Sequence, residues 1–201
     1  IHVPLIIVHP EYKGGNSIDA VTSHLDLAPT FIDMTNLPDD KKAQIAAGLP
    51  GHSLMDLMDG SKTKIREGAL FAYEMISMID SNMVQTTDPT TNITTYDIDY
   101  TKRGFVRGIT TEKYKFARYF SPLTFNLPTT MEDLYANNDV QLFDLEKDPN
   151  ELVNLAADKE TNAALIMELN GQLNDLITKE IGVDDGSEAA TVISQINKTP
   201  N

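Results

Sequence analysis

FVRGITTEKYKFARYF, residues 105–120, holds two runs of apolar, β-branched and aromatic residues on either side of a short polar turn. The runs at 105–110 and 114–120 predict a β-hairpin that turns around Thr111 and Glu112. A further short strand is expected at 141–145, because a turn-forming sequence, KDPN, follows it closely. These segments together predict a small antiparallel sheet.

A long helix is expected after this sheet, over residues 159–181. Asp158 is a suitable N-cap, and Gly182 is a suitable stop. The helix has one apolar stripe, formed by Leu165, Leu169, Leu173, Leu176 and Ile177. The second half of the chain therefore predicts an antiparallel sheet with one long helix packed on it.

The first part of the chain has a different pattern. VPLIIV at residues 3–8 is continuous and apolar, which predicts a buried strand. SHLD at residues 23–26 is a capping signal that opens a helix. ALFAYEMI at residues 69–76 predicts a second buried strand. Strand, helix and strand in this order indicate the edge of an α/β sheet.

Two stretches, 78–101 and 121–138, lack sustained periodicity and are predicted to be long loops. Loops of this length in a compact domain are often functional. We therefore divide the chain into the end of an α/β domain (1–77), a subdomain with an antiparallel sheet and long helix (78–183), and a polar tail (184–201).

The composition excludes several classes of function. The net charge is −14 and there is no basic run, so nucleic-acid binding is not expected. No apolar stretch approaches the ~20 residues of a membrane-spanning helix. Cysteine is absent, which excludes disulfides and thiolate metal sites. The acidic pairs at 39–40 and 184–185 are interpreted as solvated charge.

Several segments in order resemble the C-terminal half of the sulfatases in the alkaline-phosphatase superfamily. IHVPLII at 1–7 is similar to the family's IRVPLII strand, and DLAPTFID at 26–33 is similar to its D-x-x-P-T-x-x-D helix start. GHSL at 51–54 matches its G-x-S-L turn. YKF at 114–116, with LFDLEKDPNELVNL at 142–155, resembles its YKY and LYDLxxDPxExxNL segments. The chain departs from the family at His2 and Thr110, where arginine is usual or frequent.

The resemblance implies an α/β fold, which in this chain is α+β: edge strands and helices of the sulfatase domain, then a small antiparallel sheet on a long helix. It also implies a hydrolase of sulfate esters that uses a formylglycine nucleophile and Ca²⁺ or Mg²⁺. The C/S-x-P-x-R motif and the family's metal-binding motifs do not occur here. We therefore expect the chain to begin after the last catalytic lysine and to be inactive alone. Its expected partners are the upstream sulfatase half and a sulfate ester, and the family favours a periplasmic or secreted location.

No catalytic residue or metal ligand is predicted within the chain. The candidates for substrate contact are Arg107, Glu74, His52 and His9. A structural ion pair explains Arg107 as well as substrate binding does, and a salt bridge is the simpler reading of Glu74. His52 lies in a glycine-flanked turn where plain exposure is the simpler reading, and His9 ends the first predicted strand.

Alternative functions remain open on these residues. A sulfatase is the leading interpretation. One alternative is that the parent protein is a phosphonate monoester hydrolase or phosphodiesterase of the same superfamily; another is that the chain is a stand-alone binding domain without enzymatic activity. In the sulfatase interpretation, the predicted loops 78–101 and 121–138 border the active-site cleft and shape substrate choice.

Overall fold

The computed structural model describes residues 3–12, 14–74, 84–92 and 94–185. The chain divides into two compact units, Ile1–Ala69 and Leu70–Asn201, and each is described by itself. Helices and a sheet both contribute to the architecture, which confirms the predicted α+β class.

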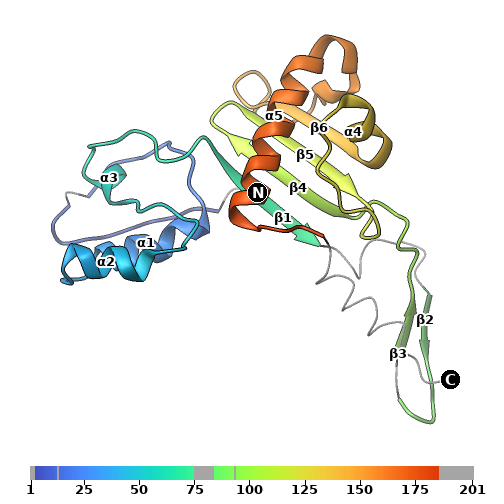
Figure 1. Ribbon diagram of the computed structural model, residues 1–201, viewed down its shortest axis with the longest axis horizontal. Helices are drawn as coiled ribbons and strands as arrows, with labels where there is room; N and C mark the ends of the chain where they lie inside the picture. The colour runs from blue at the N-terminus through green and yellow to red at the C-terminus, as the bar shows by residue number, and fades with distance from the viewer. Residues whose placement is uncertain (1–2, 13, 75–83, 93, 186–201) are drawn as a thin grey trace. The chain divides into compact units, whose positions relative to one another are not determined.

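The second unit is organised around a four-stranded sheet in the order β1-β4-β5-β6 (Figure 1). Its strands are β1 (Gly68–Glu74), β4 (Phe105–Thr111), β5 (Tyr114–Phe120) and β6 (Asp139–Asp144). β4 pairs antiparallel with β5, and β5 pairs antiparallel with β6. At the hairpin turn, the Thr111 hydroxyl accepts a hydrogen bond from the backbone N–H of Tyr114, at 2.8 Å. The predicted hairpin and third strand are confirmed.

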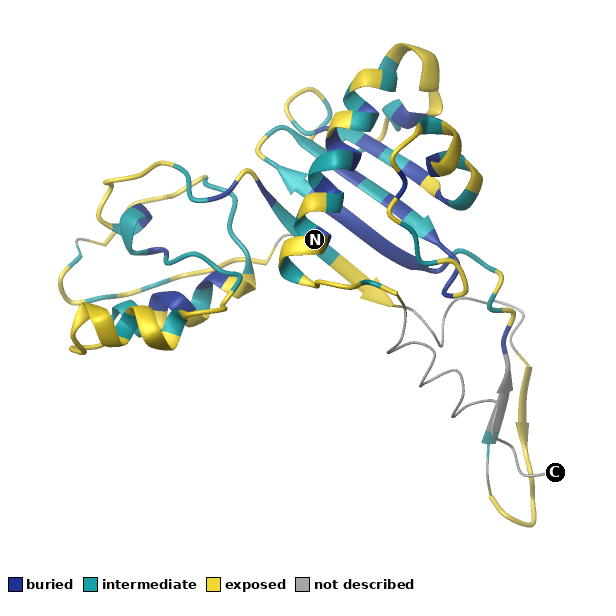
Figure 2. Ribbon diagram, in the orientation of Figure 1, coloured by how far each residue is buried: buried dark blue, intermediate teal, exposed yellow. Residues whose placement is uncertain are grey.

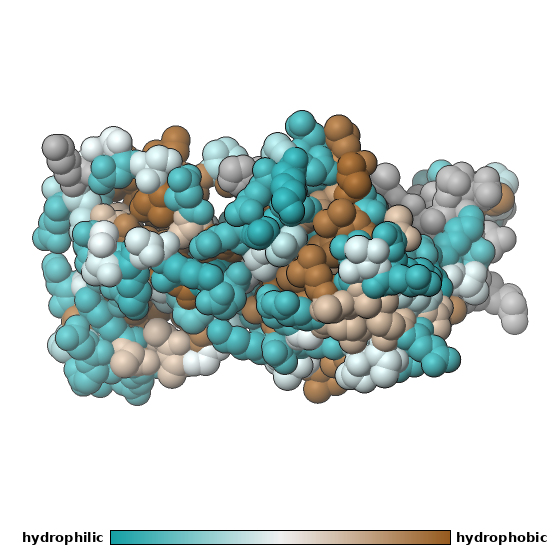
Figure 3. Space-filling model, turned by 90° about the horizontal axis from the view of Figure 1, so that it is seen from above, coloured by the Kyte–Doolittle hydropathy of each residue, from teal (hydrophilic) through white to brown (hydrophobic). Residues whose placement is uncertain are grey.

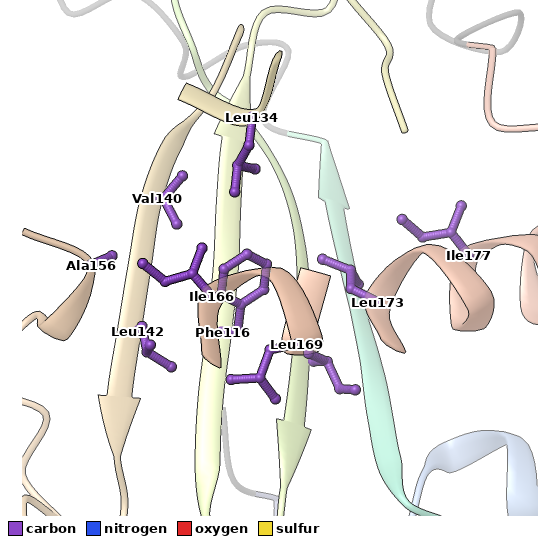
Figure 4. Packing of buried hydrophobic residues seen from close by; sticks show 10 residues of the cluster. Phe116, Leu134, Val140, Leu142, Ala156, Ile166, Leu169, Leu173 and Ile177 are labelled. Atoms are coloured by element: carbon purple, nitrogen blue, oxygen red, sulfur yellow. The ribbon is translucent and has the colours of Figure 1, made fainter. Parts of the chain in front are cut away.

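Helix α5 (Lys159–Glu180) lies across this sheet (Figure 1). The Asp158 side chain caps it by accepting from the backbone N–H of Thr161, and Gly182 follows it with a φ of +88°, as predicted. Figure 4 shows side chains of α5 pointing toward the apolar residues of the strands. The hydrophobic core is formed by Ile109, Phe116, Leu134, Val140, Leu142, Ala156, Ile166, Leu169, Leu173 and Ile177.

The two predicted loops contain regular structure, so that prediction was partly wrong. The stretch 78–101 holds the hairpin of β2 (Val84–Thr87) and β3 (Thr94–Asp97), while residues 78–83 lie outside the described part. The stretch 121–138 holds α4 (Met131–Asn137), capped by Thr130. Both elements are short, and a 3.6- or 2-residue period is hard to recognise over one or two turns. The short η3 (Leu155–Ala157) precedes α5.

The first unit is helical. It contains η1 (His24–Asp26), α1 (Leu27–Asp33), α2 (Asp39–Ala46) and α3 (Met55–Met58). The predicted capping box is present. The Ser23 hydroxyl accepts a hydrogen bond from the backbone N–H of Leu25, and the Asp26 carboxylate accepts one from the backbone N–H of Ser23.

The two strands predicted to be buried in an α/β sheet differ from the prediction. Residues 3–8 form no strand and are mostly exposed, with Ile6 at 88% and Val8 at 92%, because no described strand lies beside them to pair with. The run at 69–76 does form β1, but β1 is an edge strand of the antiparallel sheet and is exposed toward Glu74 (Figure 2). Residues 75 and 76 lie outside the described part.

Candidate functional site

In the first unit, the carboxylate of Asp26 is the centre of a buried polar cluster. The side chain is fully buried and accepts backbone N–H groups from Ser23 and His52, each at 2.8 Å. It also pairs with the guanidinium of Arg66, whose Nε lies 3.1 Å from Oδ2 and whose Nη2 donates to Oδ1. A buried carboxylate is stable only when it is paired and hydrogen-bonded in this way.

A second hydrogen bond joins the helix-start segment at 26–33 to the turn at 51–54. The Thr30 hydroxyl accepts from the backbone N–H of Leu54 at 2.9 Å. Gly51 is required there, since a Cβ at this position would lie 1.9 Å from the carbonyl oxygen of Leu25. The D-x-x-P-T and G-x-S-L segments therefore bind each other. The structure assigns them a role in holding the turn against the helix.

The two candidate histidines lie in the first unit. His52 is partly buried, and its backbone is held by the Asp26 carboxylate. His9 is also partly buried; its Nδ1 accepts from the backbone N–H of Glu11 at 3.3 Å, and its ring lies 5.1 Å from that of Tyr12. A contact of either imidazole with substrate stays a prediction.

In the second unit, Arg107 and Glu74 are brought together. Arg107 is 2% exposed, and its Nη2 lies 2.8 Å from Glu74 Oε1. The same guanidinium holds Asp184 with two bonds, from Nε at 2.8 Å and from Nη2 at 2.9 Å. Burial lowers the pKa of Arg107, but the bonds with the two carboxylates outweigh burial and leave the pKa raised. The structural ion pair considered from the sequence is therefore present.

The role of Asp184 corrects the sequence interpretation. Its side chain is only 9% exposed, so it is a nearly buried ion-pair partner and not a solvated charge. The predicted polar tail begins with this anchored residue, while residues 186–201 lie outside the described part. Asp184 and Arg107 are 77 positions apart, and no local pattern signals a pair at such a separation.

Arg118 is a further buried cation that the sequence does not single out. It stands opposite Arg107 in the β4–β5 register and is 1% exposed. Its Nη1 donates to Asn170 Oδ1 on α5 at 2.7 Å, while its Nε and Nη2 have no hydrogen-bond partner among the described residues. The pKa of Arg118 is lowered to about 10, chiefly because burial disfavours the charged guanidinium; the nearby Asp184 opposes this shift and the nearby Arg107 adds to it.

These charges form one polar layer within the core. Successive pairs on the helix-covered face of the β4–β5 ladder are Ile109 with Phe116, Arg107 with Arg118, and Phe105 with Phe120. The guanidinium carbon of Arg107 lies 5.6 Å from the ring centre of Phe120, a cation–π distance. We name the set of Glu74, Arg107, Arg118, Asn170 and Asp184 the arginine layer. It lies between two apolar parts of the core, one around Ile109 and Phe116 and the other around Phe105 and Phe120.

The residues of the DPxExxNL segment also have structural partners. The Asp148 carboxylate accepts from Val153 N–H at 2.7 Å, and Glu151 pairs with Lys115 of β5. The side chain of Asn154 accepts from Leu142 N–H at 2.9 Å and donates to the carbonyl oxygen of Val140 at 3.1 Å. This segment therefore fastens the turn after β6 to the sheet.

The described residues offer neither a metal site nor a membrane span. Across the described ranges, no three histidine, aspartate or glutamate side chains gather so as to hold a metal ion. The residues present thus do not fit the cation that the family uses, and no reaction step is assigned to them. No helix in the described part is long and apolar enough to cross a bilayer.

The known proteins to which this chain is similar in sequence or structure include several sulfatases. No family model matches the chain. Arylsulfatase K of Xenopus laevis is 35% identical over 63 residues, which are 31% of this chain and 11% of that protein. Among solved structures, a Bacteroides thetaiotaomicron protein assigned to the sulfatases is 21% identical with a TM-score of 0.46, over 78% of this chain and 25% of its own. A 2-O glycosaminoglycan sulfatase is 23% identical with a TM-score of 0.45, over 80% of this chain and 25% of its own.

The chain thus spans 11% of its curated relative and 25% of each of these two structures. The sequence similarity agrees with the resemblance seen in the residues themselves. The ordered motifs and the similarity to a curated arylsulfatase both support a resemblance of this chain to the C-terminal part of the sulfatases.

Proposed function

We propose that the chain is the C-terminal part of a sulfuric ester hydrolase and that it completes the fold of the enzyme. The observation that carries this proposal is the sequence similarity to an arylsulfatase, together with the family motifs in their family order. In this proposal, residues upstream supply the formylglycine nucleophile and the ligands for Ca²⁺ or Mg²⁺. When bound, that cation polarises the sulfate oxygens. The family favours a periplasmic or secreted location for such an enzyme.

The apolar surface of the first unit supports a role in fold completion. Among its described residues, only two large hydrophobic side chains, Leu54 and Leu57, are buried. Exposed hydrophobic side chains include Val3, Leu5, Ile6, Val8 and Phe31. Figure 3, coloured by residue hydropathy, shows hydrophobic residues in brown beside hydrophilic residues on the visible face of the molecule. Extended apolar segments are stable in water when a neighbouring strand covers them, and the upstream sulfatase half is the proposed neighbour.

Activity assays test the proposal directly. The purified chain is expected not to hydrolyse an aryl sulfate, with or without Ca²⁺, because it lacks the nucleophile motif. A chain extended upstream through the C/S-x-P-x-R motif, matured to formylglycine, is expected to release sulfate. The matched control is the same extended chain with alanine at the nucleophile. Turnover by the purified chain, or an extended folded chain without activity on any sulfate ester, would contradict the proposal.

We further propose that the segments 78–101 and 121–138 shape substrate choice in the intact enzyme. The described part of these segments has an exposed hairpin strand, β2, and exposed side chains at Leu123 and Leu127. Loops carried on a rigid scaffold often set specificity. Replacing residues 122–127 in the extended enzyme with a glycine-serine linker is expected to change the ratio of kcat/KM between two sulfate esters. An unchanged ratio in an enzyme that keeps its fold would exclude this role.

A further inference from the structure

The arginine layer has more hydrogen-bond donors than acceptors. Arg107 forms ion pairs with two carboxylates, whereas Arg118 forms none with any residue that the structure describes. Within the described residues, the Nε and Nη2 groups of Arg118 are buried without a partner. A buried guanidinium in this state is costly, and a bound anion relieves both parts of the cost, the missing hydrogen bonds and the uncompensated charge.

The segment that follows α5 brings a carboxylate, that of Asp184, against Arg107. Gly182, in the left-handed region, turns the chain away from the helix, and Asp184 follows two residues later. Both carboxylate oxygens of Asp184 accept from Arg107 and have no bond to Arg118. We name residues 182–185 the strap. The strap thus places one internal carboxylate beside two guanidinium groups.

We propose that Arg107 and Arg118 form a binding site for a small tetrahedral oxyanion, of the class of sulfate or phosphate, and that the strap occludes the site with the carboxylate of Asp184. Arg107 and Arg118 are paired across β4 and β5, so their guanidinium groups project from the same face of the sheet and present planar sets of donors, which suit the oxygens of such an anion. Asn170 accepts from Nη1 of Arg118 and so fixes the orientation of the Nε and Nη2 groups of the same guanidinium.

Charge favours an anion over a water molecule when the strap is open. With Asp184 withdrawn, the carboxylate that remains paired with these arginines in the described part of the chain is that of Glu74, whose side chain is 32% exposed. A water molecule satisfies hydrogen bonds but leaves the second positive charge without compensation. With Asp184 in place, the attached carboxylate competes at a high effective concentration, so the closed form binds anions weakly.

The experiment compares sodium sulfate with sodium chloride at equal ionic strength on the full 201-residue chain. Binding is followed by calorimetry and by amide shifts of residues 105–120. Asp184→Asn is expected to raise the affinity for sulfate about tenfold or more, because it removes a charged competitor. The matched control is Asp185→Asn, the same charge change at an exposed neighbour, and it is expected to change the affinity less than about twofold.

A second variant ties the effect to the proposed site. Asp184→Asn combined with Arg118→Met is expected to lose the gained affinity. Phosphate and acetate arms separate a tetrahedral oxyanion from a carboxylate ligand. Equal sulfate affinity in Asp184→Asn and Asp185→Asn, or binding that survives Arg118→Met, would overturn the inference. So would a crystal structure of Asp184→Asn grown in sulfate that shows only water on Arg118. No step of this test depends on sulfatase activity, so it can fail independently of the proposed function.

Discussion

Replacing Arg107 by methionine is expected to lower the free energy of unfolding of the second unit by about 3 kcal/mol or more. The substitution leaves the carboxylates of Glu74 and Asp184 without their cation, and Asp184 is nearly buried. It also frees the strap, because the described bonds of the Asp184 carboxylate go to Arg107. Hydrogen exchange of the β5 amides measures the change, since these amides open only when the sheet unfolds.

Two control variants show whether the stranded carboxylates cause this loss. Arg118→Met, directly across the ladder, removes a cation of equal size but leaves no carboxylate without its ion-pair partner. The loss of unfolding free energy in this variant is therefore expected to be much smaller. Arg103→Met breaks an ion pair with the exposed Asp139 and is expected to cost less than about 1 kcal/mol. Equal losses for Arg107→Met and Arg118→Met would show that packing, and not charge pairing, determines the stability of this layer.

Replacing Gly51 by alanine is expected to unfold the turn that the first unit depends on. The new Cβ would meet the Leu25 carbonyl at 1.9 Å, and this neighbour is backbone within a capped segment that cannot move aside cheaply. Relief of the clash requires the turn to leave the helix. The N–H groups of His52 and Leu54 then lose their bonds to Asp26 and Thr30. Loss of protection of these two amides in hydrogen exchange is the expected measurement.

The matched control is Gly14→Ala. Gly14 has no atom within 4 Å of the added Cβ and has no left-handed backbone, so the substitution is expected to change amide protection in the first unit very little. The β5 amides serve as an internal reference in both variants, because they belong to the second unit. Full protection of the His52 amide in Gly51→Ala would contradict the close packing of the two motif segments.

Much of the second unit was predictable because its signals are local. The hairpin at 105–120 and the helix α5 follow from alternation, helical spacing and caps that lie within a few residues of each other. The stretch 3–8 shows the limit of such patterns. Its residues favour a strand, but a strand exists only with a hydrogen-bonded neighbour, and none is among the described residues.

The charged residues show a similar division. Arg107 and Glu74 were candidates from their positions in the sequence, while their pairing with each other and with Asp184 depends on the fold. Arg66 and Arg118 were not candidates, since an isolated arginine carries no pattern of its own. Their importance comes from burial, which removes water and makes each hydrogen-bond partner, or its absence, energetically significant.

The sequence by itself determined the helix, the hairpin, the absence of a nucleophile motif and the likeness to sulfatases, because each is written in neighbouring residues or in an ordered set of motifs. The tertiary structure alone decided that the family motifs bind one another through Asp26 and Thr30, and that two arginines share the core with the Asp184 carboxylate. The physical reason is that charges and backbone groups far apart along the chain interact strongly only after folding has brought them together and excluded water.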